Sequence, residues 1–260
     1  GAPAIKNLRI MFIKEASQRT TALQTGEVDC AYDVLSSDYE TLLADGFEGK
    51  ELFGDKSFNL MFNCSENSIC ADPRVRQAIA YATDNEGILA AAFGGFGEIC
   101  TTCSSNGMVD IGDMYHPEDY YHYNLDTAKQ LLQEAGVAEG TSVNIMIRSG
   151  DASQTTSAEI IQQSLQSIGM NAEIMQVEAA VYDDTQKDHT AGWDVSLNDM
   201  NTAGSMSALD LVNLYCYIIP NLGYTNEEDA ALSAQAVSST DEQFISDATY
   251  QLSQTVCEDV

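Results

Sequence analysis

The feature that most constrains this fold is an alternation of strand-like and helix-like segments in the middle of the chain. Two strands that are joined through a helix pair in parallel, with a right-handed crossover. The middle of the chain therefore predicts parallel strands with helices packed against the sheet. The β-rich apolar runs are residues 142–148, 170–177 and 194–198, and the segments with helical spacing are residues 153–168 and 179–189.

The first 63 residues also alternate between strand-like and helix-like segments, which predicts an α/β arrangement there. The helical segments are about ten residues long, and each ends at a glycine, Gly26 or Gly46, as helices commonly do. The predicted strands are residues 8–13, 28–33, 47–53 and 57–63.

A strong helix start lies at Asp72-Pro73, with aspartate as the N-cap and proline in the first turn. The helix carries its apolar residues at spacings of three and four, which predicts one buried face. We expect Arg74 and Arg76 to tie this helix to nearby carboxylates such as Asp84. The residues of the predicted buried face are Val75, Ala78, Ile79 and Ala82.

The charge balance excludes two classes of partner. Eleven Lys and Arg against 40 Asp and Glu give a net charge of −29. Such a chain repels phosphate backbones and anionic lipid, so we expect no nucleic acid partner. No run approaches the roughly 20 apolar residues that span a bilayer, so we expect no direct membrane insertion.

Enzyme motifs are absent from the sequence: it has no G-x-S-x-G elbow, no phosphate-binding loop and no H-E-x-x-H. Cys100-Thr-Thr-Cys103 has the spacing of a redox or metal pair, which leaves a redox enzyme as an alternative from another class. A zinc site normally needs a second such pair, and none follows. Glu and Asp pairs are expected anywhere at this charge, so they favour no glycosidase.

The chain has seven cysteines, so at least one is unpaired. Cys64 and Cys70 flank a short loop and are candidates for a disulfide. Cys30 and Cys257 lie in segments with an apolar pattern, which predicts buried thiols.

In doubly wound sheets, ligands bind beyond the carboxyl ends of the strands. Two such ends carry polar residues, and the alternative for both is a solvated strand end. Arg148 is a cation in a chain short of cations, which favours a carboxylate-bearing ligand. The candidate ligand-binding residues are Arg148, Ser149 and Asp151 after one strand, and Asn198, Asp199, Met200 and Asn201 after another.

Five motifs, in order along nearly the whole chain, resemble family 5 of the extracellular solute-binding proteins that serve ABC importers. The most specific is the helix start just described, which resembles the family's "N…D.rVRqAiayAiDr" signature together with Asn63. The matching segments are ALQTGEVD at 22–29, DPRVRQAIAYATD at 72–84, AKQLLQEAG at 128–136, AEIIQQSLQSIG at 158–169 and GYTN at 223–226.

The resemblance implies an α/β fold: a periplasmic-binding-protein-like lobe, with a mixed sheet flanked by helices and part of a second lobe at the N-terminus. Residues 1–62 would be part of the first lobe. Residues 63–260 would be the second, ligand-binding lobe, without its C-terminal return. The lobes would close on one ligand by a hinge, outside the cytoplasmic membrane, in the periplasm or at the cell surface as a lipoprotein.

The resemblance also implies the partners, which are a small ligand, foremost an oligopeptide, and the membrane subunits of an ABC importer. It implies no enzyme activity, cofactor or metal. The second candidate loop lacks the tryptophan that peptide-binding members often carry, so a sugar stays open, while Asp199 suits a peptide amine. Trp193 is predicted to be core. A metal-chelate or haem ligand held by Cys100, Cys103, His116 and His122 is a further alternative to a loop packed by tyrosines.

Overall fold

The computed structural model describes residues 4–51, 56–100, 121–201, 207–213 and 222–259. The chain divides into two compact units, Gly1–Leu52 and Phe53–Val260. The division falls ten residues before the predicted domain boundary at residue 62. The strand before that boundary belongs to the larger unit because its backbone pairs with a strand there.

The smaller unit holds two helices, α1 (Ala16–Gln24) and α2 (Ser36–Ala44). The Thr20 hydroxyl of α1 donates a hydrogen bond to the Asp38 carboxylate of α2 at 2.8 Å. Thr20 is buried, as is Leu42 on α2. This unit therefore has a small interior in which a polar contact joins the two helices.

The strands predicted at 8–13, 28–33 and 47–53 are not observed; residues 8–13, 28–33 and 47–51 are described, and none of them is in a strand. Alternating apolar residues make a segment suitable for a sheet, but a strand also needs a neighbouring backbone to complete its hydrogen bonds. Leu8, Ile10 and Phe12, which alternate along one of these segments, are 79%, 69% and 96% exposed.

In the part of the larger unit that the structure describes, one mixed sheet of four strands has the order β1-β4-β2-β3. The three later strands run in parallel, as predicted, and β1 joins the edge antiparallel to β4. This confirms the predicted fold class. The strands are β1 (Lys56–Phe62), β2 (Ser142–Arg148), β3 (Asn171–Val177) and β4 (Val195–Asn201).

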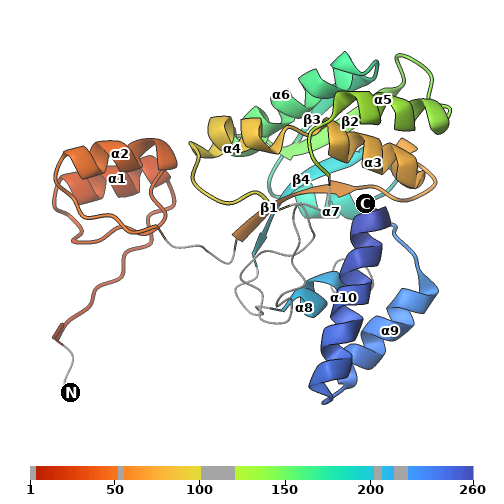
Figure 1. Ribbon diagram of the computed structural model, residues 1–260. Helices are drawn as coiled ribbons and strands as arrows, with labels where there is room; N and C mark the ends of the chain where they lie inside the picture. The colour runs from red at the N-terminus through yellow and green to blue at the C-terminus, as the bar shows by residue number, and fades with distance from the viewer. Residues whose placement is uncertain (1–3, 52–55, 101–120, 202–206, 214–221, 260) are drawn as a thin grey trace. The chain divides into compact units, whose positions relative to one another are not determined.

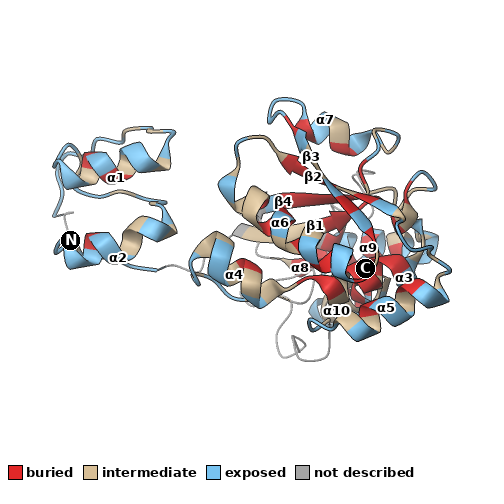
Figure 2. Cartoon of the chain, turned by 90° about the horizontal axis from the view of Figure 1, so that it is seen from above, coloured by how far each residue is buried: buried red, intermediate tan, exposed pale blue. Residues whose placement is uncertain are grey.

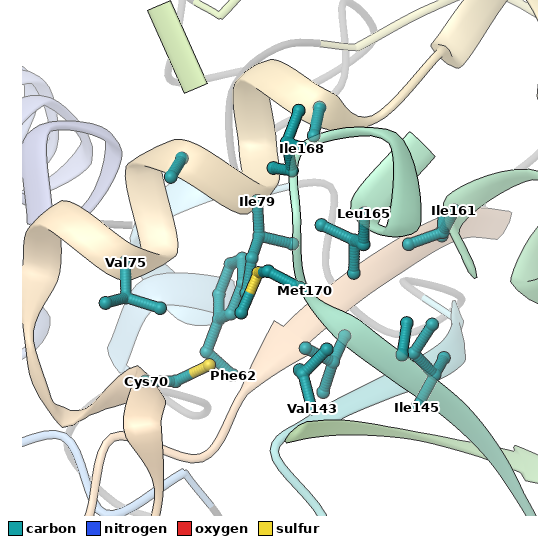
Figure 3. Packing of buried hydrophobic residues seen from close by; sticks show 14 of the residues in the cluster. Phe62, Cys70, Val75, Ile79, Val143, Ile145, Ile161, Leu165, Ile168 and Met170 are labelled. Atoms are coloured by element: carbon teal, nitrogen blue, oxygen red, sulfur yellow. The ribbon is translucent and has the colours of Figure 1, made fainter. Parts of the chain in front are cut away.

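Four helices cover one face of this sheet, and their side chains form the main core (Figures 1 and 3). Ile79 of the helix that begins at Asp72-Pro73 packs beside Phe62 of β1, while Ile161 and Leu165 face β2. Figure 2 shows β2 and β4, the two central strands of the sheet, as largely buried, whereas the edge strand β3 mixes buried, intermediate and exposed residues. The helices are α3 (Pro73–Ala82), α4 (Asn85–Phe93), α5 (Leu125–Glu134) and α6 (Ala152–Ser167).

The opposite face is covered by α7 (Tyr182–Lys187). Met146, which alternates with the core residues of β2, packs there with Tyr182 and Trp193. Trp193 is 1% exposed, which confirms its prediction as a core residue. Because α6 and α7 lie on opposite faces, the connections that leave β2 and β3 diverge at the carboxyl edge of the sheet.

Three further helices pack around a core of their own, apart from the sheet. Arg76 of α3 joins them to the main core: its Nε donates to the Asp259 carbonyl at 2.6 Å and its Nη1 to the Cys70 carbonyl at 2.8 Å. Among the described helices, none is both long and apolar enough to cross a bilayer. The three are α8 (Ala208–Val212), α9 (Glu227–Ser238) and α10 (Glu242–Asp259).

The arginines of α3 have a tethering role; Arg74 binds a nearby carboxylate as predicted, whereas Arg76 binds carbonyls, and neither pairs with Asp84 among the described contacts. Arg74 pairs with Asp72 at 2.6 Å and donates to the Glu134 carbonyl at the end of α5. Arg76 binds carbonyl groups, since a buried guanidinium can serve several carbonyl oxygens at helix ends. The Asp84 carboxylate instead accepts from the Gly87 amide and caps α4.

Asn63, at the end of β1, holds the approach to β4 through its side chain. It is fully buried. Its Nδ2 donates to the carbonyl oxygens of His189 at 3.2 Å and Trp193 at 3.0 Å, and its Oδ1 accepts from the Ser65 hydroxyl at 2.7 Å. One side chain therefore satisfies two backbone carbonyls of a segment that lies more than 120 residues further along the chain.

Asp194 completes this junction from the other side. Its Oδ1 accepts from the Ser68 hydroxyl at 2.6 Å, and its Oδ2 accepts from the Asn144 amide of β2 at 2.9 Å. Its backbone carbonyl accepts from the Asn63 amide at 2.8 Å. Asn63 and Asp194 together fix β1, β2 and β4 relative to one another at one end of the sheet.

We predict that Asn63→Ala lowers the free energy of unfolding by about 3 kcal/mol, because it leaves buried carbonyls without a donor. Urea unfolding followed by circular dichroism measures the change. The matched control is Asn67→Ala, at an exposed position four residues on, which should change stability by less than about 0.5 kcal/mol. Equal stabilities for the two variants would show that the Asn63 bonds contribute little.

Candidate ligand-binding site

Parallel pairing brings the carboxyl ends of β2 and β4 to one edge of the sheet. Met146 pairs with Ser196, and Arg148 and Asn198 each lie two residues further along. Side chains two apart on a strand share a face, so both point to the side of the sheet that carries α7. The structure therefore brings one residue from each predicted group to the same edge.

Arg148 is the cation of this edge. Its guanidinium carbon lies 4.0 Å from the centroid of the Tyr182 ring, and its Nη2 lies 3.1 Å from Asp183 Oδ1. The Arg148 side chain is 24% exposed and that of Asp183 is 73% exposed. A guanidinium carries five N–H donors, and Asp183 is its only side-chain partner among the described residues. Arg148 thus keeps donors for a further acceptor.

Tyr182 fixes the surface on which Arg148 lies. Its hydroxyl lies 2.8 Å from the Leu197 carbonyl of β4 and 3.2 Å from the Met146 carbonyl of β2, and donates toward both. Tyr182 is fully buried, and this burial raises the pKa of its phenol well above the usual range. The ring therefore stays neutral and rigid beneath the guanidinium.

The loop after β2 is ordered by its own backbone and by a helix cap. The Ser149 amide donates to the Val177 carbonyl of β3 at 2.8 Å. The Asp151 carboxylate accepts from the Gln154 amide at 2.9 Å as the N-cap of α6. Gln154 Oε1 accepts in turn from the Arg148 amide at 2.7 Å. Asp151, predicted as a ligand contact, thus serves as the N-cap of α6, and Gln154 of this helix holds the Arg148 backbone.

The second predicted group does not form a loop. Residues 198–201 continue β4, because their backbone pairs with β1 from Asn59 to Lys56. The sequence contains no β-branched residue after Val195 in this strand, so the pairing with β1 decides its length.

The side chains of this group divide between the two faces. Asn198 is 6% exposed, and its Nδ2 donates to Ser196 Oγ at 3.1 Å and to the Met61 sulfur at 3.4 Å. Asp199 is exposed and points to the other face, away from Arg148. The side chains of Met200 and Asn201 lie outside the described part of the chain. Alternation along a strand therefore separates residues that a loop would have kept together.

The sequence did not indicate three residues of this edge: Tyr182, Asp183 and Gln186. Gln186 donates to Ser196 Oγ at 2.7 Å in the same buried polar row as Asn198. All three lie on the short helix α7, and their sequence carries no motif. The only available signal was the position of the helix between two strands, which places one of its faces over the sheet.

Among the described residues, no three His, Cys, Asp or Glu side chains group together so that they could hold a metal ion. Cys103 and His116 lie outside the described residues, whereas Cys100 and His122 lie within them. The predicted disulfide is not formed: Cys64 and Cys70 are both free thiols. Cys257 is buried as predicted, but Cys30 is exposed.

A shallow depression of about 340 Å³ lies away from the Arg148 edge, on the amino-terminal half of the sheet strands. Asn144 already donates to the Gly192 carbonyl within it at 2.7 Å. Its lining has no cation, so it offers less to a charged ligand than the Arg148 edge does. The lining residues are Asn144, Glu173, Ile174, Met175, Ala191 and Gly192.

The four-stranded mixed sheet, with helices on both faces and a polar carboxyl edge, defines a lobe of the periplasmic-binding-protein type. The family model for bacterial extracellular solute-binding proteins, family 5 (middle segment) matches residues 1–215. The chain belongs to this family, whose members are extracytoplasmic binding proteins of ABC transporters.

Curated relatives support the assignment. The chain is 25% identical over 196 residues to the oligopeptide-binding protein AppA of Bacillus subtilis, with 68% of the chain and 35% of the relative covered. It is 24% identical over 184 residues to the glutathione-binding protein GsiB of Pectobacterium atrosepticum (69% and 34%). It is 28% identical over 190 residues to haem-binding protein A of Haemophilus influenzae (70% and 34%). The chain spans about a third of these relatives' length.

A solved structure shows the same fold. The crystal structure of the ABC transporter substrate-binding protein CtaP from Listeria monocytogenes superposes with a TM-score of 0.82 at 20% identity. The match covers 95% of this chain and 50% of that one. At this identity the likeness concerns the fold alone.

We predict that Tyr182→Phe lowers the free energy of unfolding by about 1–3 kcal/mol, because two buried carbonyls lose their donor while the ring remains under Arg148. Urea unfolding measures the loss. Tyr250→Phe, at a half-exposed position on α10, is the matched control and should change stability by less than about 0.5 kcal/mol. A Tyr182→Phe variant as stable as the wild type would mean that the hydroxyl does not hold the two strands.

The thiols should differ in reactivity. Burial raises the pKa of the Cys70 thiol well above its ordinary value, and burial also raises that of Cys64. A raised pKa leaves little thiolate at pH 8, so iodoacetamide should alkylate exposed Cys30 and leave Cys70 intact until the chain unfolds. Peptide mapping by mass spectrometry reads each site.

The same experiment in guanidinium chloride is the control, since every cysteine should then react. Alkylation of Cys70 in the folded protein as fast as Cys30 would contradict the buried environment. Reaction of the Cys100–Cys103 peptide well ahead of Cys30 would instead favour the redox alternative.

Proposed function

We propose that this chain is the ligand-binding part of an extracytoplasmic solute-binding component of an ABC importer, and that it is not an enzyme. Its ligand is a small molecule with a carboxylate, foremost an oligopeptide, held at the carboxyl edge of β2 and β4. The observation that carries the proposal is Arg148, a rigidly held and partly exposed guanidinium at the edge where the connections of the sheet diverge.

The electrostatics of the chain make this position unusual. The 260 residues include eleven Lys and Arg, and the two arginines of α3 hold helices together. A guanidinium recognises carboxylates through paired N–H donors, and Arg148 retains such donors. A cation in so acidic a chain gives a strong local preference for an anionic group, which the rest of the surface would repel.

The relatives' ligands share the same chemistry. Oligopeptides end in a carboxylate, glutathione carries two, and haem carries two propionates. The printed names of three relatives therefore differ in ligand class and agree in the group that Arg148 would bind. Peptides come first because two of the three are peptide ligands, and haem is the second candidate.

We also propose the domain roles. Residues 1–62 contribute to a first lobe and residues 63–260 form the second, with the ligand enclosed between them by hinge closure. The two compact units support this division, although the observed boundary lies at residue 52. The exposed Leu8, Ile10 and Phe12 support the proposal that the smaller unit is part of a larger lobe. Docking to importer membrane subunits and a lipoprotein anchor complete the proposal.

The experiment is a thermal-shift screen against trialanine, an oligosaccharide, nickel and haem, on this chain and on the longest natural polypeptide that contains it. A ligand at 100 times its Kd stabilises the native state by about 2.7 kcal/mol, which raises the Tm by several degrees. Trialanine should raise the Tm. Trialanine amide lacks the carboxylate, so it should need a concentration at least about tenfold higher to give the same shift in Tm.

Arg148→Gln should weaken trialanine binding by about tenfold or more and leave trialanine amide unaffected. The matched control is Lys187→Gln, which removes one positive charge from an exposed position at the end of α7. Equal binding of acid and amide would remove Arg148 from the site. A shift with the oligosaccharide alone would overturn the carboxylate proposal.

A further inference from the structure

Asp183 stands where a ligand carboxylate would bind. The pair between Arg148 and Asp183 is a single contact, Nη2 to Oδ1 at 3.1 Å, and the Asp183 side chain is 73% exposed. We propose that Asp183 is a specificity-determining residue: it acts as an internal competitor that lowers the affinity of the Arg148 edge for simple anions. The inference rests on the proposed role of Arg148 as the carboxylate contact.

Arg148 is held in place by contacts that do not involve Asp183. The guanidinium stacks on Tyr182, and the Tyr182 hydroxyl is held between carbonyls of β2 and β4. The backbone beneath Arg148 is held as well, through the bond from its amide to Gln154. An incoming anion therefore meets the guanidinium where it already lies, next to Asp183.

Two modes of binding are open to that anion, and Asp183 opposes both. The anion can displace Asp183 from Nη2, which breaks an existing ion pair, or it can use the remaining donors and lie close to a second negative charge. Like charges that share one partner repel each other. Because Asp183 is exposed, solvent screening keeps the penalty modest, so it lowers the affinity for every carboxylate and in practice excludes only those that bind weakly by themselves.

The consequence concerns ligand class. Acetate, which offers only a carboxylate, has no other contact to offset the competition. A peptide offers backbone groups and side chains in addition, so its binding survives the competition. Asp183 would thus keep the site free of common small anions, and ligands with a carboxylate on a larger polar body would still bind.

The test compares Asp183→Asn with Asp184→Asn in the 260-residue chain. Asp184 is the next residue of α7, it is 85% exposed, and its carboxylate lies 3.6 Å from Lys187 Nζ. The two variants therefore change the same charge on the same turn. Acetate binding is followed through the Nε–Hε NMR signal of Arg148, which is assigned by its loss in Arg148→Lys. Trialanine and trialanine amide are titrated in parallel.

Asp183→Asn should tighten acetate and trialanine binding by about threefold to tenfold at low salt, whereas Asp184→Asn should change either by less than about twofold. Trialanine amide should bind equally to all forms. At about 1 M sodium chloride, the ratio of the affinities of Asp183→Asn and the wild type should fall toward one, because salt screens exposed charges. A merely structural effect of Asp183 would not depend on salt or on the ligand's charge.

The outcomes separate the two proposals. If the Arg148 signal shows tighter acetate binding in Asp183→Asn but no peptide binds, Asp183 does compete for Arg148 and the proposed peptide binding is wrong. If trialanine binds through Arg148 and Asp183→Asn leaves its affinity unchanged or weaker, the function stands and the competitor role is overturned. If both Asp183→Asn and Asp184→Asn tighten anion binding equally, the effect comes from the net charge of the chain, and this result would also overturn the competitor role of Asp183.

Discussion

The junction of Asn63 with Asp194 is the interaction on which the rest of the larger unit depends. Asn63 is a buried, uncharged side chain that donates to backbone carbonyls just before β4. Asp194 accepts a hydrogen bond from the backbone amide of Asn144, near the start of β2. Both side chains replace backbone partners that the chain lacks where its strands begin and end. A buried amide or carboxylate is costly unless all its hydrogen bonds are made, so this junction specifies one arrangement of β1, β4 and β2.

That arrangement positions the opposite end of the sheet. With β2 and β4 in fixed register, their carbonyls at Met146 and Leu197 converge on one hydroxyl, that of Tyr182. The Tyr182 ring then carries the Arg148 guanidinium. The polar edge is thus built from the hydrogen bonds between Tyr182 and the sheet and from a partly exposed guanidinium that stacks on the Tyr182 ring. In the function that we propose, this gives the protein a rigid recognition group on an otherwise acidic, anion-repelling molecule.

Local patterns predicted the elements that carry their own stabilisation. The cap at Asp72, the apolar face of α3 and the strand–helix alternation from residue 142 onward are all present in the structure. Patterns failed where a partner elsewhere decides the outcome. Residues 8–13 have a strand's alternation and no strand neighbour among the described residues, whereas residues 199–201 have little strand propensity and extend β4 because β1 lies beside them.

The sequence by itself determined the fold class, the family and the position of Arg148 at a strand end, because hydrophobic period, capping residues and motif order are local properties. Only the tertiary structure decided which neighbours that strand end would have. Asn198 and Asp199 are adjacent in sequence and lie on opposite faces, while Arg148 and Asp183 are 35 residues apart and form an ion pair. Side-chain alternation and the crossover of α7 produce both results, and neither can be derived without knowing which strands pair.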